Sequence, residues 1–234
     1  MDAHRFVRLG RTWVDCSSLA AMRSGILFYR PGRRWLRWGV RIGWWIVAAW
    51  LSLKRQRGKT IAEIMPGFDV EAAIGSVEFA TIYVGNGSSR AKFTVMARRA
   101  DGNEIIVKVA ETDGGKAAIC DEMCALRQLA KSNLSSQVPR LLGGGVQGRW
   151  GWSAQSRLRL GSSPLRLQKE HYDFLRGLKC INLSHGDFAP WNCAVVEGRL
   201  VVWDWEDAGD WVDGKDEAWF KKQVKELLGV DNGE

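Results

Sequence analysis

The chain has 234 residues, 46% of them hydrophobic and 26% charged, and this composition excludes a chain that is disordered over most of its length. The net charge of +8 is uneven: residues 1–60 carry 13 Lys or Arg and 2 Asp or Glu, whereas residues 61–234 carry 21 and 24. Because the main body is slightly acidic, the charge argues against a wholly basic nucleic-acid-binding domain. Nucleic-acid binding by residues 1–60 has only this charge in its favour.

The basic, Trp-rich segment of residues 1–60 predicts an amphipathic helix at residues 35–53. Apolar positions recur at helical steps of three and four, at Leu36, Val40, Trp44, Val47 and Leu51. A basic stripe follows similar steps, at Arg30, Arg34, Arg37 and Arg41. The charge-free part, residues 42–53, has 12 residues, whereas a spanning helix needs about 20. We therefore favour residues 30–57 lying on an anionic membrane surface; the alternatives are a helix packed on the body and a helix that spans the membrane.

The cysteines and the N-terminal residues favour a cytoplasmic location. Five cysteines without a CxxC pair, together with three histidines, argue against a disulfide scaffold and a structural zinc site. Arginines interrupt residues 1–30, so we expect no cleavable signal peptide there. The expectation is a cytoplasmic protein that is peripheral at the inner face of a membrane.

The main body begins near residue 61, and residues 61–155 predict a first lobe. Thr60 and Glu63 match the capping-box pattern that starts a helix, and Pro66-Gly67 predicts its end. Strands are predicted at residues 77–85, 92–98, 104–111, 138–142 and 150–155, with a hairpin turn at 100–103 and a glycine turn at 143–145.

Three features of this lobe suit a nucleotide site. The turn between its first two strands contains Gly85 and Gly87, which let backbone N–H groups approach a phosphate, although most such turns bind nothing. Lys108 lies within an apolar strand, and Glu122 lies on the apolar face of a helix predicted at 115–131. A buried carboxylate needs a cation, so Lys108 is the expected partner of Glu122. The alternative is a solvated Glu122 at the edge of that face.

Residues 156–234 predict a second lobe. A linker at 156–163 precedes a helix that starts at Ser163-Pro164 and runs to residue 178. His171 in this helix is expected to be packed rather than a metal ligand, because no other His or Cys accompanies it. Further on, acidic residues recur at steps of three, at Asp207, Asp210, Asp213 and Asp216. We expect a solvated turn and helix start there; the alternative is that these carboxylates bind an amino group of a substrate.

The most informative stretch is residues 184–209, which read SHGDFAPWNCAVVEGRLVVWDWEDAG. Two short apolar runs joined by residues 197–199 predict a β-hairpin. Because a hairpin brings its ends together, Asn192 before it and Asp204 after it can place side-chain oxygens together, as Mg²⁺ requires. Asp187 lies five residues before Asn192, on a loop that can reach the same place.

This order is that of the kinase catalytic loop and its metal-binding Asp. Over residues 75–215 the sequence resembles the aminoglycoside phosphotransferase and choline kinase group of protein-kinase-like small-molecule phosphotransferases. The resemblance rests on HGDFAPWN at 185–192 and DWE at 204–206. It implies an α+β, two-lobed, protein-kinase-like fold, with an antiparallel sheet and a helix in the N-lobe and a shortened helical C-lobe, preceded by the N-terminal extension 1–60.

The same resemblance implies the roles of individual residues, with ATP as the donor and Mg²⁺ as the metal ion. Asp187 resembles the catalytic base, and Asn192 and Asp204 resemble the Mg²⁺ ligands. Lys108 resembles the lysine that contacts the α- and β-phosphates, and Glu122 resembles its ion-pair partner.

The glycine turn with Gly85 and Gly87 resembles the loop that covers the phosphates. Gly186 stands where protein kinases have the Arg that couples to a phosphorylated activation loop, so regulation of that kind is not expected. Only 30 residues follow Asp204, which implies fewer of the helices that shape the acceptor pocket in this group.

We therefore expect a kinase-like phosphotransferase that uses ATP and Mg²⁺ and acts on a hydroxyl of a small molecule or saccharide at a membrane surface. The alternative is a kinase-shaped pseudoenzyme that acts as a membrane-attached binding or scaffold protein. The shortened second lobe favours the alternative, whereas the retained Lys108, Glu122, Asp187, Asn192 and Asp204 oppose it.

Overall fold

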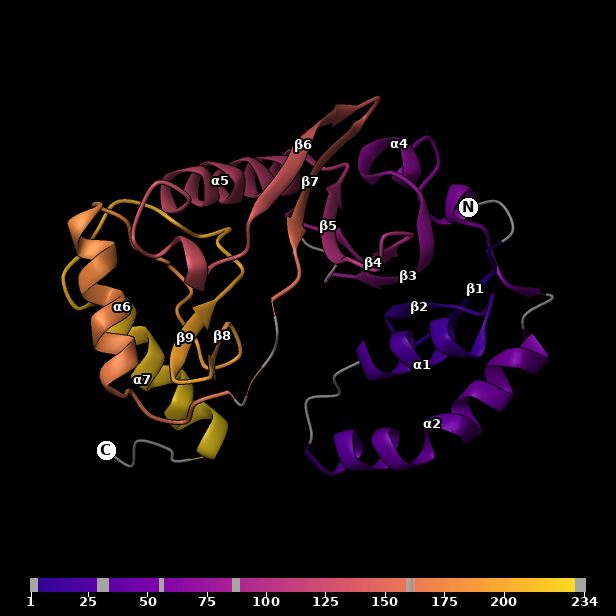
Figure 1. The fold of residues 1–234 in the computed structure, drawn as a ribbon, viewed down its shortest axis with the longest axis horizontal. Coiled ribbons are helices and arrows are strands. Elements are labelled where there is room, and N and C mark those ends of the chain that lie inside the picture. Colours follow the sequence, from indigo (N-terminus) through magenta and orange to yellow (C-terminus); the bar gives the residue numbers. More distant parts are fainter. Residues whose placement is uncertain are drawn as a thin grey trace. The chain divides into compact units, whose positions relative to one another are not determined.

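The structure is a computed structural model that describes residues 4–28, 34–54, 57–85, 89–158, 161 and 163–229, with residues 27–28 and 34–42 described through their backbone alone (Figure 1). The chain divides into two compact units. Unit 1 comprises Met1–Lys116 and Gly143–Ala154, and unit 2 comprises Ala117–Leu142 and Gln155–Glu234.

Unit 1 contains almost all of one sheet. Within the described ranges this sheet has seven strands in the order β1-β2-β3-β4-β5-β7-β6. The strands are β1 Phe6–Leu9, β2 Thr12–Asp15, β3 Val77–Val84, β4 Phe93–Arg99, β5 Glu104–Ala110, β6 Leu141–Gln147 and β7 Trp150–Ser156. Neighbours from β1 to β5 pair antiparallel. The predicted α+β class with an antiparallel sheet is therefore confirmed.

Four helices of unit 1 lie before β3. They are α1 Leu19–Phe28, α2 Arg34–Lys54, α3 Ile61–Ile64 and α4 Val70–Ile74. The helix predicted at 35–53 is confirmed as α2. No helix in the described part of the chain combines the length and apolar character that crossing a membrane requires.

The predicted capping box is confirmed at the start of α3. The backbone N–H of Thr60 donates to Glu63 Oε2 over 2.6 Å, and the N–H of Glu63 donates to Thr60 Oγ1 over 3.3 Å. The helix then ends at Ile64, ahead of the predicted stop at Pro66-Gly67, where Gly67 has a φ of +80°.

Strands β1 and β2 of the N-terminal segment were not predicted from sequence. Each strand has four residues, and Gly10, with a φ of +61°, lies in the turn between them. In β2, Thr12 pairs with Tyr83 and Val14 with Thr81, so this segment extends the sheet at β3. Strands this short carry little pattern of their own, and it is pairing with β3 that stabilises them.

Two further boundaries differ from the prediction. The glycines at 143–145 were expected to form a turn, but they lie within β6, and the turn falls at Gly148-Arg149. The helix expected to start at Ser163-Pro164 starts instead at Lys169, where Gln168 is the N-cap and its N–H donates to His171 Nδ1 over 3.1 Å. This cap, in which a histidine ring nitrogen accepts the N-cap N–H, was not predicted from sequence.

Unit 2 combines helices with a hairpin around one apolar core. Its elements are most of α5 Asp113–Leu129, the 3₁₀ turn Ser135–Gln137, α6 Lys169–Cys180, β8 Cys193–Val196, β9 Arg199–Val202 and α7 Lys215–Leu228. Large buried side chains from these elements and the loops between them fill the core, among them Leu126, Phe174, Phe188, Trp205 and Phe220. His171 is fully buried beside Phe188 and Phe220, as expected of a packed histidine.

Candidate functional site

The hairpin predicted between Asn192 and Asp204 is confirmed. Its two-residue turn, Glu197-Gly198, has φ values of +51° and +74°, the left-handed pair that matches the twist of a tight hairpin. The second strand, β9, starts at Arg199, one residue earlier than expected. Beyond the strands, the N–H of Trp203 donates to the carbonyl of Asn192 over 3.0 Å. Backbone hydrogen bonding between the two arms of the hairpin therefore extends to Asn192 and to Trp203, the residue before Asp204.

Asp187 and Asn192 are brought together as the sequence predicts. The Asn192 amide Nδ2 donates to Asp187 Oδ2 over 2.9 Å and to the Asp187 carbonyl over 3.0 Å. The other carboxylate oxygen, Oδ1, accepts a 2.7 Å bond from the indole Nε1 of Trp219 on α7. Both oxygens of this half-buried carboxylate are thus held by neutral donors, which fixes the orientation of its plane.

The loop at 185–187 has a backbone shape that only glycine satisfies at its centre. Gly186 has a φ of +84°, and a Cβ on it would lie 1.9 Å from the carbonyl oxygen of Asp207. The loop is anchored from α7, because Asp216 accepts the N–H groups of His185 (2.8 Å) and Gly186 (3.0 Å). Asp216 is only 2% exposed. The expectation of a solvated acidic tail was therefore wrong for this residue.

His185 is a buried neutral histidine that supports the same loop. Its Nε2 lies 3.0 Å from the carbonyl oxygen of Trp203, and its Nδ1 lies 3.3 Å from the N–H of Asp187. A carbonyl only accepts and an N–H only donates, so Nε2 carries the proton and Nδ1 is the acceptor. Burial lowers the pKa of His185 below its usual value, which agrees with the neutral form.

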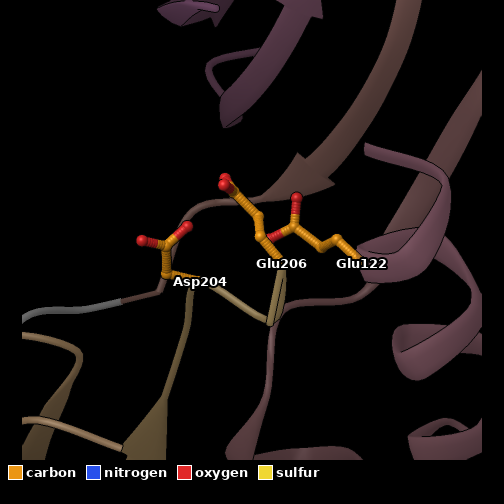
Figure 2. Close-up of side chains that lie close together, drawn as sticks. All are labelled: Glu122, Asp204 and Glu206. Carbon is orange, nitrogen blue, oxygen red and sulfur yellow. The ribbon is translucent and has the colours of Figure 1, made fainter. Parts of the chain in front are cut away.

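Three carboxylates cluster beyond the end of the hairpin (Figure 2). Glu122 extends from α5, and Asp204 and Glu206 come from the segment that follows β9. One oxygen from each lies within 4.8 Å of the others. Glu122 is fully buried and Glu206 is 8% exposed. The prediction that Glu122 lies on the buried face of its helix is confirmed, and the alternative of a solvated edge position is wrong.

One carboxylate oxygen of Glu122 contacts two other segments of unit 2. Its Oε1 accepts the backbone N–H of Trp205 over 3.3 Å and lies 3.5 Å from Gln155 Nε2. Asp204 has a φ of +70°, a conformation that is uncommon outside glycine and that is enriched at functional sites. Three carboxylates at this separation have the chemistry of a site for a hard divalent cation.

The remaining predicted site residues belong to unit 1. Lys108 lies in the middle of β5, opposite Thr94, and is 5% exposed. Gly85 directly follows β3, and its N–H donates to the Lys92 carbonyl over 2.9 Å. Gly87 lies outside the described residues. Because Lys108 and Glu122 belong to different units, their pairing stays a prediction.

The contacts of Trp219, Asp216 and Glu206 at this site were not predicted from sequence. Glu206 had a local signal, since it completes the DWE triplet after the hairpin. Trp219 and Asp216 had no local signal. The partner of Trp219 lies 32 residues away along the chain, and the partners of Asp216 lie 31 and 30 residues away. Helix α7 brings both side chains back to the loop at 185–187.

No protein-family model matches the chain, and no curated protein matches it. The residues themselves therefore carry the functional argument.

Proposed function

We propose that this chain is a phosphotransferase with a protein-kinase-like, two-lobed fold that transfers a phosphoryl group from ATP to a hydroxyl of a small molecule or saccharide. One observation carries the proposal. Asp187 is hydrogen-bonded to Asn192, and the hairpin that follows returns the chain to Asp204 beside two further carboxylates. Carboxylate, asparagine and carboxylate in this order are the parts that a kinase active site uses.

Asp187 is the residue that would receive the acceptor hydroxyl. A carboxylate can accept or orient the hydroxyl proton, and it does so best when its plane is fixed in advance. Asn192 and Trp219 fix that plane through one oxygen each. Each carboxylate oxygen has more than one acceptor site, so Asp187 can still accept a further hydrogen bond from a substrate.

The donor set fits Mg²⁺, because oxygen atoms are the ligands this ion prefers. Asp204 would hold it, together with the amide oxygen of Asn192, whose amide nitrogen is engaged by Asp187. Glu122 and Glu206 add carboxylates close to Asp204. When bound, Mg²⁺·ATP supplies the phosphoryl group and neutralises the charge on it. In unit 1, Lys108 would contact the α- and β-phosphates, and the turn with Gly85 and Gly87 would cover them.

The second candidate is a kinase-shaped scaffold without activity. The part of the chain between β7 and β8 favours it, since the described residues there form a single helix, α6, where the resemblance implies more. The pairing of Asp187 with Asn192 ahead of the hairpin opposes it, because a scaffold does not need the kinase order of carboxylate, asparagine and carboxylate.

The test is ATP consumption by the full-length protein against a panel of aminoglycosides, amino alcohols, monosaccharides and a lipid-linked saccharide. We expect at least one acceptor to raise consumption above the rate in its absence. Asp187→Asn should lower that rate by about 10²–10⁴, the usual effect of removing a positioned base. Asp121→Asn, at an exposed position on α5, should leave it unchanged. Equal rates for Asp187→Asn and wild type would remove Asp187 from this role.

A further inference from the structure

Helix α2 has one face packed on the protein and another that faces solvent. Ala48 and Leu51 are 1% and 0% exposed and pack with β1, β2 and α1, and Trp44 and Val47 flank the same core. Trp44, Val47 and Leu51 belong to the apolar face that was predicted from sequence to lie on a membrane. Their burial shows that this part of the face is used within unit 1.

A second apolar face lies on the other side of the same helix. Its members are Trp45 (61% exposed), Ile46 (56%), Trp50 (45%) and Leu53 (84%). Ile46, Trp50 and Leu53 recur at steps of four and three, so they form one stripe along the helix. This stripe contains one tryptophan and two aliphatic side chains, and with the exposed Trp45 beside it the face has more apolar side chains than the scattered ones of an ordinary surface.

The stretch of sequence that contains this stripe carries charge of a single sign. Residues 16–62 contain ten Lys or Arg and no Asp or Glu. A surface that complements it must be anionic and must also accept apolar side chains. An anionic lipid bilayer offers both, since its headgroups attract Lys and Arg and its acyl boundary accepts apolar side chains. Trp suits this boundary because its ring is apolar and its N–H is polar.

We infer that α2 docks on an anionic membrane surface through Trp45, Ile46, Trp50 and Leu53. This surface is not the face expected from sequence, and the inference does not depend on phosphoryl transfer. Because α2 is packed against α1 and the sheet, docking would hold the whole of unit 1 at the membrane rather than a detached anchor.

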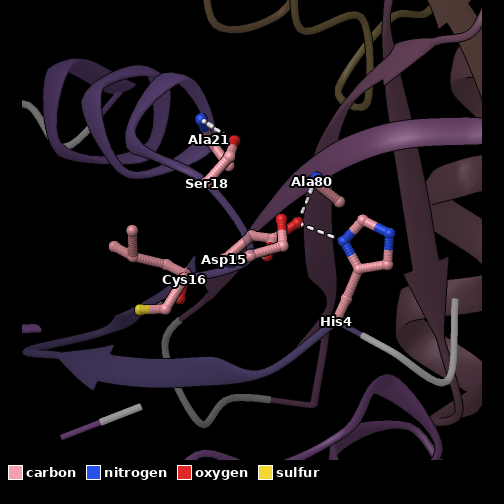
Figure 3. A network of polar contacts seen from close by, with 8 residues as sticks. His4, Asp15, Cys16, Ser18, Ala21 and Ala80 are labelled. Carbon is pink, nitrogen blue, oxygen red and sulfur yellow. Dashed lines mark hydrogen bonds and ion pairs between the residues drawn. The ribbon is translucent and has the colours of Figure 1, made fainter. Parts of the chain in front are cut away.

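The N-terminal segment cannot be removed to test this inference. Asp15, at the end of β2, is fully buried; its carboxylate accepts the N–H of Ala80 on β3 over 3.3 Å and lies 2.6 Å from His4 Nδ1 (Figure 3). Ser18 caps α1 by accepting the N–H of Ala21 over 3.1 Å. Truncation would therefore break the sheet, and the experiment needs the full chain.

The experiment is co-sedimentation of full-length protein with vesicles of phosphatidylcholine alone or of phosphatidylcholine mixed with the anionic lipid phosphatidylglycerol. We expect binding to the anionic vesicles, and weaker binding in high salt because charge contributes. Ile46→Ser with Leu53→Ser should weaken binding by about tenfold or more, since both apolar contacts are lost. Trp45→Ser with Trp50→Ser should do the same.

The matched control is Leu227→Ser with Leu228→Ser, two leucines of α7 that are 54% and 56% exposed. This variant should bind as the wild type does, and circular dichroism should show that all variants are folded. Equal loss in the control, or wild-type protein that stays in the supernatant, would overturn the inference. Self-association of the wild type that Ile46→Ser with Leu53→Ser abolishes would assign the stripe to a second copy of the chain instead.

Discussion

The indole Nε1 of Trp219 donates a 2.7 Å hydrogen bond to Oδ1 of Asp187, across 32 residues of sequence. With Asn192 on Oδ2, this bond gives the carboxylate a fixed plane. The last helix of the described chain is therefore part of the candidate site rather than an appendage to it.

Trp219→Phe tests whether this bond positions the base. Phenylalanine keeps the apolar ring but removes the N–H, so the carboxylate plane is held by Asn192 alone. We expect kcat to fall by about tenfold, the effect of losing roughly one well-formed hydrogen bond of about 1.4 kcal/mol, with little change in KM for ATP. A higher KM for ATP with an unchanged kcat would show that Trp219 serves nucleotide binding instead.

Gly186→Ala should destabilise the fold strongly. The new Cβ would have to move the Asp207 backbone, and the left-handed φ adds strain, for a combined cost of about 2–5 kcal/mol in the free energy of unfolding. Gly198→Ala is the matched control, because its φ is +74° but no atom lies within 4 Å of the added Cβ. It should cost only about 1–2 kcal/mol. Urea unfolding measures both, and equal losses would contradict the steric argument.

Stability should fall as the pH drops below about 6.5, the ordinary pKa of histidine. Burial lowers the pKa of both His171 and His185 in the folded protein. The folded state keeps them neutral while the unfolded state takes up protons, so the unfolded state gains stability as pH falls. Each histidine adds at most about 1.4 kcal/mol per pH unit to the slope.

The slope between pH 7 and pH 5 is the quantity to compare. His171→Asn removes one titrating group and should flatten the slope of the unfolding free energy, although it also costs packing. Phe174→Leu costs packing beside the same core but removes no titrating group, so its slope should match the wild type. An unchanged slope in His171→Asn would show that this histidine does not contribute.

Contacts between residues that are close together in the chain could be predicted from sequence. The capping box of Thr60 and Glu63 and the hairpin turn at Glu197-Gly198 each involve residues a few positions apart, and both formed, the turn being one residue shorter than predicted. The buried face of α5 was also predictable, because Glu122, Leu126 and Leu129 recur at helical steps. In these cases one short segment contains the whole pattern.

Contacts between distant segments were not predictable in the same way. Asp216 is one of four acidic residues at equal spacing, and only the fold distinguishes it by placing it under the loop at 185–187. Asp213, three residues earlier, pairs with Lys179 at the surface. Strands β1 and β2 likewise depend on β3, which follows more than 60 residues later. A spacing rule cannot separate a buried carboxylate from an exposed one when both fit the pattern.

The most direct test of the proposed function is calorimetric titration of the full-length protein with ATP, with and without Mg²⁺. We predict binding in Mg²⁺ with a Kd between about 1 μM and 1 mM, the range usual for enzyme substrates. Asp204→Asn should weaken it by about tenfold or more, since a charged Mg²⁺ ligand is lost; asparagine tolerates the +70° φ at this position, so the backbone is not strained. Asp210→Asn, at an exposed position, should bind as the wild type does. Folded wild-type protein that binds no ATP in Mg²⁺, or that binds it equally well after Asp204→Asn, would contradict the account.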